Sequence, residues 1–113
     1  MIFDSKTIVY SLEDNWDELV SITFVNEDTY LSFNSLAYDE EIGIELNDQL
    51  NYVRLFKNDF KFKLLPDACH VALENPIKQN NFPSLNIIVH FQEVDLEKLT
   101  RALNALIWDD SRQ

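Results

Sequence analysis

The 113-residue sequence contains a single glycine, Gly43, and a single cysteine, Cys69. Loops that cradle phosphate groups and dinucleotide-binding turns need two or three glycines, because glycine lets the backbone approach a phosphate or adopt positive φ without strain. The scarcity of glycine therefore excludes P-loop and Rossmann-type nucleotide binding. One cysteine cannot form an internal disulfide, which leads us to expect a reducing, cytoplasmic location.

The chain also lacks long hydrophobic runs and, over its first part, basic residues. Its apolar runs, such as 87–89 and 105–108, are far shorter than the roughly 20 residues of a membrane-spanning helix. The N-terminus has no basic and apolar leader, so we expect no secretory signal. Residues 1–48 contain 12 acidic residues and one basic residue, Lys6, whereas residues 49–113 contain 8 of each. Because phosphates and anionic lipids are bound by clustered Lys and Arg, this charge excludes nucleic acid and membranes as partners.

Length and composition predict one globular domain that spans residues 1–113. Hydrophobic residues make up 46% of the chain and include 8 Phe, 4 Tyr and 2 Trp, which is enough for a core. The chain is too short for a second core.

Most of the chain alternates between apolar and polar residues with a period of two, which is typical of strands that bury one face. The pattern predicts seven strands, at 7–11, 19–25, 29–34, 41–46, 52–56, 60–64 and 85–91. The turn formers at 26–28 predict a hairpin between the second and third strands. Asn58 and Asp59 predict a two-residue turn, and hence a second hairpin, between 52–56 and 60–64.

The period changes after Asp95, which is placed to cap a helix. Five apolar residues then recur at the spacing of one helical stripe: Leu96, Leu99, Leu103, Leu106 and Ile107. Strands followed by one amphipathic helix predict an α+β domain. We expect a mostly antiparallel β-sheet of about six to seven strands, with the C-terminal helix packed on one face.

The segment between the last two predicted strands contains all three prolines, Pro66, Pro76 and Pro83. Proline lacks a backbone donor and fixes φ, so it favours irregular structure. We therefore predict a long connection over residues 67–82, with a short helical turn at 68–73.

No combination of residues predicts a catalytic or metal site. Cys69 and His70 are adjacent, and neighbours on a chain usually point apart, so a nucleophile–base pair is not indicated. His70 and His90 lack zinc-motif spacing, and His90 is interpreted as a structural histidine on the polar face of a strand. Glu41 and Glu45 would lie about 13 Å apart on a strand, beyond the roughly 5 to 10 Å of a glycosidase pair. We therefore expect no enzymatic activity, no cofactor and no metal.

A cluster of acids in the middle of the chain is the strongest functional signal. Five acidic residues fall within ten positions, with tyrosines on both sides and Tyr30 nearby. Charge steers the encounter between proteins, and aromatic side chains provide contact area. The alternative is that the acids serve only to keep a small domain soluble. We assign a partner-binding surface to Tyr38, Asp39, Glu40, Glu41, Glu45, Asp48 and Tyr52.

Three segments carry a further pattern: YLSF at 30–33, IELNDQ at 44–49 and VRLFKNDFKFKL at 53–64, followed by a closing strand and helix. In this pattern, over approximately residues 30–108, the chain resembles the immunity protein 10 family of bacterial polymorphic toxin and contact-dependent growth inhibition systems. The resemblance implies a small cytoplasmic protein that binds and neutralises a cognate protein toxin and has no catalytic activity.

The charge of the chain favours the same class of protein. A toxin that attacks nucleic acid has a basic active-site cleft, and a strongly acidic partner would associate with it rapidly. We therefore expect an immunity protein that covers the functional surface of a basic, nuclease-like toxin; its oligomeric state is left open. The alternative is a phage-encoded acidic mimic of nucleic acid that acts as an anti-restriction inhibitor. A small enzyme or ligand-binding domain is a third interpretation, but the sequence shows no convergent polar residues for it.

Overall fold

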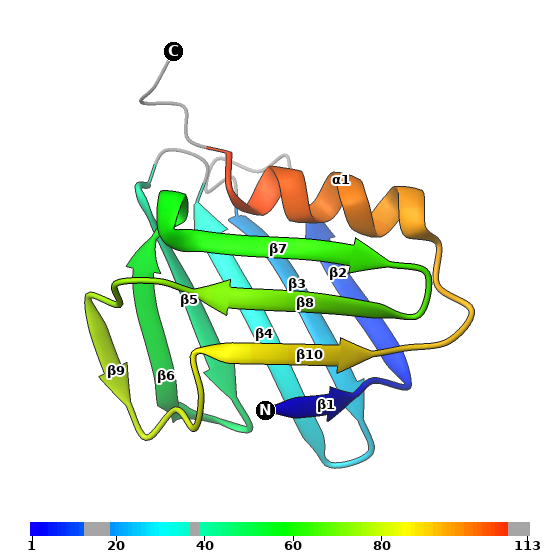
Figure 1. Cartoon of the computed structure of the whole chain (residues 1–113), viewed down its shortest axis with the longest axis horizontal. Coiled ribbons are helices and arrows are strands. Elements are labelled where there is room, and N and C mark those ends of the chain that lie inside the picture. Colours follow the sequence, from blue (N-terminus) through cyan, green and yellow to red (C-terminus); the bar gives the residue numbers. More distant parts are fainter. Residues whose placement is uncertain (13–18, 37–38, 109–113) are drawn as a thin grey trace.

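A computed structural model describes residues 1–12, 19–36 and 39–108, and these residues form ten strands and one α-helix (Figure 1). The first five strands are β1 (Ile2–Asp4), β2 (Thr7–Leu12), β3 (Leu19–Asn26), β4 (Thr29–Leu36) and β5 (Glu41–Leu46). The other five are β6 (Asp48–Phe56), β7 (Phe60–Leu65), β8 (Ala68–Leu73), β9 (Lys78–Asn80) and β10 (Asn86–His90). The helix is α1 (Leu96–Leu106), and a 3-10 helix at Lys57–Asp59 joins β6 to β7.

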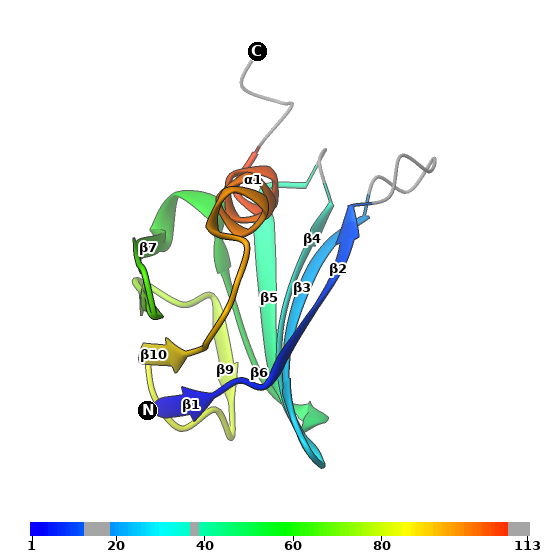
Figure 2. The same ribbon diagram turned by 90° about the vertical axis from the view of Figure 1, so that its right-hand side faces the viewer.

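The strands form two facing sheets. One has four strands in the order β1-β10-β8-β7, and the other has six in the order β2-β3-β4-β5-β6-β9. Neighbouring strands are antiparallel except β1 and β10, which are parallel. In Figure 1 the strands of the four-stranded sheet cross in front of those of the six-stranded sheet. Figure 2 shows that α1 lies between the two sheets and closes one end of the molecule.

The core lies between the sheets and under α1. Ile22, Phe24 and Phe33 from the six-stranded sheet are fully buried, as are Leu99 and Leu103 from the helix. The two sheets meet through aromatic rings: the ring of Phe33 lies 5.6 Å from that of Phe24 in its own sheet and 5.4 Å from that of Phe60 in the other, both edge to face. Such pairs add about 0.5–1.5 kcal/mol beyond the area they bury.

The fold class predicted from the sequence is confirmed, since the chain is α+β with mostly antiparallel strands and a C-terminal helix packed on a sheet. Asp95 caps the helix as expected, because its side chain accepts a hydrogen bond from the backbone N–H of Lys98 at 3.1 Å. The expected strands appear as β2 to β7 and β10. Two differences remain. Three further strands, β1, β8 and β9, bring the number of strands in the described part of the chain to ten, and the strands form two sheets rather than one.

The prediction of a helical turn at 68–73 within a long connection at 67–82 is wrong. Residues 68–73 form β8, which lies between β7 and β10, and residues 78–80 form β9 at the edge of the other sheet. Pro66 and Asp67 make a tight turn that pairs Leu65 with Ala68. The side chains of Cys69, Val71 and Leu73 alternate into the core. The prolines therefore mark connections between strands. β8 is as long as β2, β5 and β7, but its outward position 72 is an alanine, so its apolar–polar alternation is weak.

The predicted hairpin at Asn58-Asp59 is also wrong. β6 pairs with β5 and β9, whereas β7 pairs with β8, so the two strands belong to different sheets. The 3-10 helix at Lys57–Asp59, with Lys57 buried, replaces the two-residue turn and leads the chain from one sheet to the other. The other predicted hairpin is confirmed, because Asn26 pairs with Thr29 around a two-residue turn.

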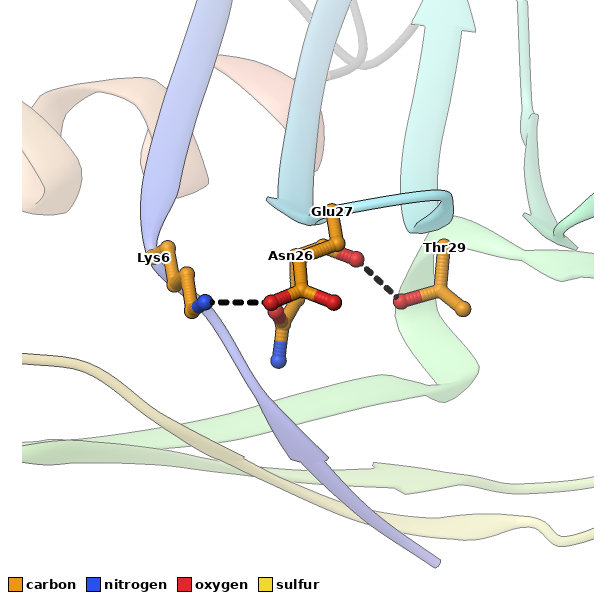
Figure 3. Close-up of polar contacts among 4 residues, drawn as sticks. All are labelled: Lys6, Asn26, Glu27 and Thr29. Carbon is orange, nitrogen blue, oxygen red and sulfur yellow. Dashed lines mark hydrogen bonds and ion pairs between the residues drawn. The ribbon is translucent and has the colours of Figure 1, made fainter.

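This β3–β4 turn shows how a chain with one glycine makes tight turns (Figure 3). Glu27 adopts a φ of 52°, and the hydroxyl of Thr29 donates to the carbonyl of Asn26 at 2.7 Å. Lys6 Nζ pairs with the Glu27 carboxylate at 2.8 Å. The other described residues with positive φ are Asn47, Asn75, Asn81 and Glu93. Asparagine tolerates this backbone region better than most other non-glycine residues, so it takes the place of glycine at three of these five positions.

Two buried polar side chains fix the C-terminal end of α1. The Ser35 hydroxyl donates to the carbonyl of Leu106 at 2.6 Å. Lys57 Nζ donates to the carbonyls of Trp108, at 2.6 Å, and Leu36, at 2.5 Å. The last carbonyls of a helix have no partner within the helix, and a positive charge is favourable at that end. These bonds tie the helix to β4 and to the crossing between the sheets.

Candidate functional site

Six of the seven residues predicted to bind a partner lie on or beside β5 and β6. Tyr38 is outside the described residues. Asp39 and Glu40 are exposed just before β5, and Glu41 and Glu45 project from the outer face of β5, away from the core. Asp48 starts β6, and Tyr52 lies on the same outer face, opposite Glu45 in register.

The structure divides these acids into two groups at opposite ends of β5. We call Asp39, Glu40, Glu41 and Phe56 the entry end, and Tyr30, Glu45, Asp48, Leu50 and Tyr52 the turn end. Glu41 and Glu45 share one face four residues apart, which is about 13 Å along a strand. The acids therefore do not converge on one spot, but occupy two ends of one sheet face.

At the entry end, part of the negative charge is compensated. Glu41 forms an ion pair with Arg54 of β6 at 3.5 Å, with both side chains well exposed. An exposed pair of this kind contributes about 0 to 1 kcal/mol. Asp39 accepts a hydrogen bond from the Glu41 backbone N–H at 3.1 Å, and Phe56, opposite Glu41, is 44% exposed. The acids of this end that have no ion pair are thus Asp39 and Glu40.

At the turn end, Tyr30 and Glu45 hold each other in place. The Tyr30 hydroxyl donates a short hydrogen bond to the Glu45 carboxylate. This bond, together with partial burial and the negative charges of Glu45 and Asp48, raises the pKa of Tyr30 from 10.0 to about 12. A tyrosine and a carboxylate are therefore presented as one oriented unit. Sequence reasoning noted Tyr30 only as a neighbour, because nothing local reveals that β4 places it beside Glu45.

Asparagine side chains make the turn beside this unit rigid. Asn47 has a φ of 62°, its side chain accepts from the Tyr30 backbone N–H at 2.7 Å, and its own N–H donates to the Tyr30 carbonyl at 3.0 Å. Asn51 donates to the Leu46 carbonyl at 3.3 Å. Asn80, from β9, donates to the carbonyl of Leu50. Leu50 itself is 66% exposed, so a rigid turn presents an apolar side chain next to Asp48.

Between the two ends lies a flat polar area of short side chains. Thr23 and Ser32 share a hydrogen bond at 3.0 Å, and Asn34 donates to the Ser32 hydroxyl at 3.1 Å. Gly43 lies in register with Asn34 and Arg54, and a methyl group added to it would meet nothing within 4 Å. The centre of the face is therefore open and low, with larger side chains at both ends.

Two cations border the face on its β6–β9 side. Arg54 pairs with Glu41, and Lys78 of β9 lies over the Tyr52 ring with its ammonium 5.8 Å from the ring centre. The only basic residue before position 49, Lys6, is bound to Glu27 in the β3–β4 turn (Figure 3). The described acids of this face that have no ion pair are therefore Asp39, Glu40, Glu45 and Asp48.

Catalytic and metal-binding features are few in the part of the chain that the structure describes. No group of three or more His, Cys, Asp and Glu side chains in these residues could hold a metal ion. Cys69 is buried, and this burial raises the pKa of its thiol from 9.0 to about 12, so the reactive thiolate is scarce. His70 is exposed on the opposite face of β8 from Cys69. The expected separation of these two neighbours is confirmed.

His90 lies on the outer face of β10 and lines a hollow of about 630 Å³ at the corner where β1 leads into β2. Charged side chains, among them Asp4, Lys6, Asp67 and Glu93, also line this hollow. It is open and mixed in charge, unlike the deep apolar pockets that enclose small ligands.

Comparison of the chain with protein-family models, with curated proteins and with solved structures gave no match. Within residues 1–12, 19–36 and 39–108, no helix is long and apolar enough to cross a membrane.

Proposed function

We propose that this protein binds and neutralises a basic protein partner, in the manner of an immunity protein with its toxin. The observation that carries the proposal is the turn end, where hydrogen bonds join Tyr30 of β4 to the β5–β6 hairpin beside the exposed Leu50. The hairpin itself carries Glu45, Asp48 and Tyr52. Tyrosine provides contact area at low entropic cost, while carboxylates steer and orient a basic partner.

The dimensions of the face suit a protein partner. A standard interface buries about 800 Å² on each side, which corresponds to a patch roughly 30 Å across. The molecule measures 35 × 31 × 23 Å, so one partner of ordinary size could cover the turn end and the entry end together. The open centre around Gly43 would accept a protruding side chain of the partner, because no side chain fills it.

The charge distribution favours rapid association. The net charge of −11 attracts a basic partner from beyond contact distance, and steering of this kind raises association rates by about 10- to 1,000-fold. At 0.15 M salt the screening length is about 8 Å, so nearby acids dominate once the partner has docked. We assign the larger share of binding to the turn end, because hydrogen bonds already order its side chains.

The proposal is tested with matched charge reversals at the two ends of β5. Tagged protein is used to recover its partner from cells of the source organism, and the association rate with that partner is then measured by stopped flow. Glu45→Lys/Asp48→Lys should slow association about tenfold at low salt. Asp39→Lys/Glu40→Lys changes the net charge equally and should slow it less. Asp4→Lys/Glu74→Lys, in β1 and just after β8, should leave the rate within about twofold.

Three outcomes would contradict the proposal. The first is recovery of no protein partner. The second is an unchanged association rate, and unchanged protection of toxin-expressing cells, in both β5 variants. The third is recovery of several unrelated DNA-binding proteins with equal efficiency, which is the behaviour of a nucleic-acid mimic rather than of a dedicated inhibitor.

A further inference from the structure

The β7–β8 side of the outer face of the four-stranded sheet is basic, whereas Asp4 of β1 lies at the opposite edge of this face. Lys61 and Lys63 alternate on β7, and both point away from the core with His70 of β8 in register beside Lys63. Both ion pairs among the described residues lie elsewhere, so neither lysine is paired with a carboxylate. In a chain of net charge −11, a group of cations without acidic partners is unexpected and calls for a functional explanation.

These cations surround a shallow hollow of about 370 Å³. We call it the basic hollow and define it by the outward side chains that line it: Lys61, Lys63, His70, Ala72, Asn86 and Ile88. Ala72 lies between Lys61 and Asn86 in register, and the depression exists because the Ala72 side chain is short. No carboxylate lines the hollow.

Apolar side chains extend the hollow toward the opposite edge of the sheet. Lys63, His70, Ile88 and Ile2 occupy one row across the four strands. Ile2 is 65% exposed at the end of this row. Neighbouring strands lie about 4.8 Å apart, so the row runs about 14 Å from a cationic end to an apolar end. This length corresponds to about four residues of extended chain.

We propose that this face is a second interaction surface, which takes an extended segment of a partner protein with acidic residues at one end and apolar residues at the other. Lys61 and Lys63 lie about 7 Å apart along β7 at the cationic end of this row, so both ammonium groups can reach carboxylates at the acidic end of the segment. The apolar end of the segment would cover Ile88 and Ile2, which otherwise expose hydrophobic surface to water.

Another role for edge-strand lysines explains only part of this arrangement. Lysines on an edge strand discourage pairing with other sheets, and β7 is an edge strand. That role does not account for His70 and Ile88, which lie on the interior strands β8 and β10 and continue the same row.

The charge of the whole molecule selects a short acidic segment over a long polyanion. The two outer faces are separated along the shortest dimension of the molecule, 23 Å, which exceeds two screening lengths of about 8 Å (Figure 2). A short segment on the basic hollow is thus shielded from the acids of the other sheet. A nucleic acid or a membrane surface would extend past the hollow and meet the negative charge around it.

The test is a titration of the isotope-labelled protein followed by amide NMR signals. The probe is a blocked peptide with three glutamates followed by Leu-Ser-Leu. It should shift the signals of Lys61, Lys63, His70 and Ile88. The affinity obtained from these shifts should fall at least tenfold between 20 mM and 300 mM salt. The same peptide with glutamine in place of glutamate should bind at least tenfold more weakly.

Matched variants locate the binding. Lys61→Glu/Lys63→Glu should abolish the shifts, whereas Lys78→Glu/Arg101→Glu, with the same change in net charge, should preserve them. The spectra also report whether each variant is folded. The acidic-face variant Glu45→Lys/Asp48→Lys should bind the peptide as before, so this inference and the proposed function can fail separately.

Several results would overturn the inference. These are the absence of shifts at 1 mM peptide, shifts located away from the basic hollow, and equal binding of the glutamine peptide. Tighter binding of a 12-nucleotide single-stranded DNA or of vesicles with anionic lipid than of the peptide would reject a protein segment as the ligand.

Discussion

Lys57 Nζ lies 2.6 Å from the carbonyl oxygen of Trp108, just beyond the end of α1, while the rest of the Lys57 side chain is buried. The same ammonium also donates to Leu36 at the end of β4. One cation therefore connects the helix, the six-stranded sheet and the crossing to the four-stranded sheet. A buried charge is tolerated here because these two carbonyls replace part of its hydration.

Replacing Lys57 with methionine should destabilise the protein by about 2 to 4 kcal/mol, because the change removes charged hydrogen bonds and leaves buried carbonyls without a partner. Methionine keeps most of the side-chain volume, so the loss reports the ammonium rather than a cavity. Urea unfolding measures the change. Lys61→Met, on the exposed face of β7, should change stability by less than about 0.5 kcal/mol. Equal effects of the two substitutions would refute the role of Lys57.

The Tyr30–Glu45 unit should give a stability change at high pH. The pKa of Tyr30 is raised from 10.0 to about 12, so the folded protein holds this proton more tightly than the unfolded chain. The resulting stabilisation is complete below pH 10 and is lost as the pH rises through 12. Between these values, unfolding free energy should fall more steeply in the wild type than in Tyr30→Phe. Phenolate absorbance should show Tyr30 ionising at lower pH in Glu45→Gln. Identical slopes in wild type and Tyr30→Phe would contradict the bond.

Cys69 should be unreactive in the folded protein. Burial within β8 raises its pKa to about 12, so both thiolate and access are scarce. A disulfide reagent at pH 8 should modify Cys69 only as fast as the protein unfolds, and urea should accelerate the reaction. The variant Lys63→Cys/Cys69→Ala carries an exposed thiol on the neighbouring strand and should react within seconds. Rapid modification of the native wild type would show that Cys69 is accessible.

Glu93 should be a position where glycine is favourable. It has a φ of 51° in the connection between β10 and α1, and such a conformation costs about 1 to 2 kcal/mol for a residue with a side chain. Glu93→Gly also makes the unfolded chain more flexible, so we expect a net gain of up to about 1 kcal/mol. Glu97→Gly, inside α1, should instead lose about 1 kcal/mol. Thermal unfolding compares the two. A loss of stability in Glu93→Gly would exclude strain at this position.

The pattern of apolar and polar residues predicted those elements that depend mainly on their own residues. The alternation of Ile22 and Phe24 with Ser21 and Thr23 predicts β3, and the leucine stripe with Asp95 predicts the capped helix. For the candidate site, the sequence placed Glu41 and Glu45 on one strand face, as they are. It could not place Tyr30 against Glu45, since that contact depends on the register between β4 and β5.

By itself, then, the sequence determined that this is an α+β domain with a strongly acidic first part and turns made almost without glycine. Apart from the β3–β4 hairpin, which its turn residues predict, only the tertiary structure decided which strands pair, because period-two alternation fits any partner strand equally well. In the folded protein β6 and β7 belong to different sheets and are joined at the buried Lys57, and residues 68–73 form an interior strand. The tertiary structure also divided the acids between two ends of one face and left Lys61 and Lys63 on the opposite side. Charge is set by composition, but its placement is set by the packing of the two sheets.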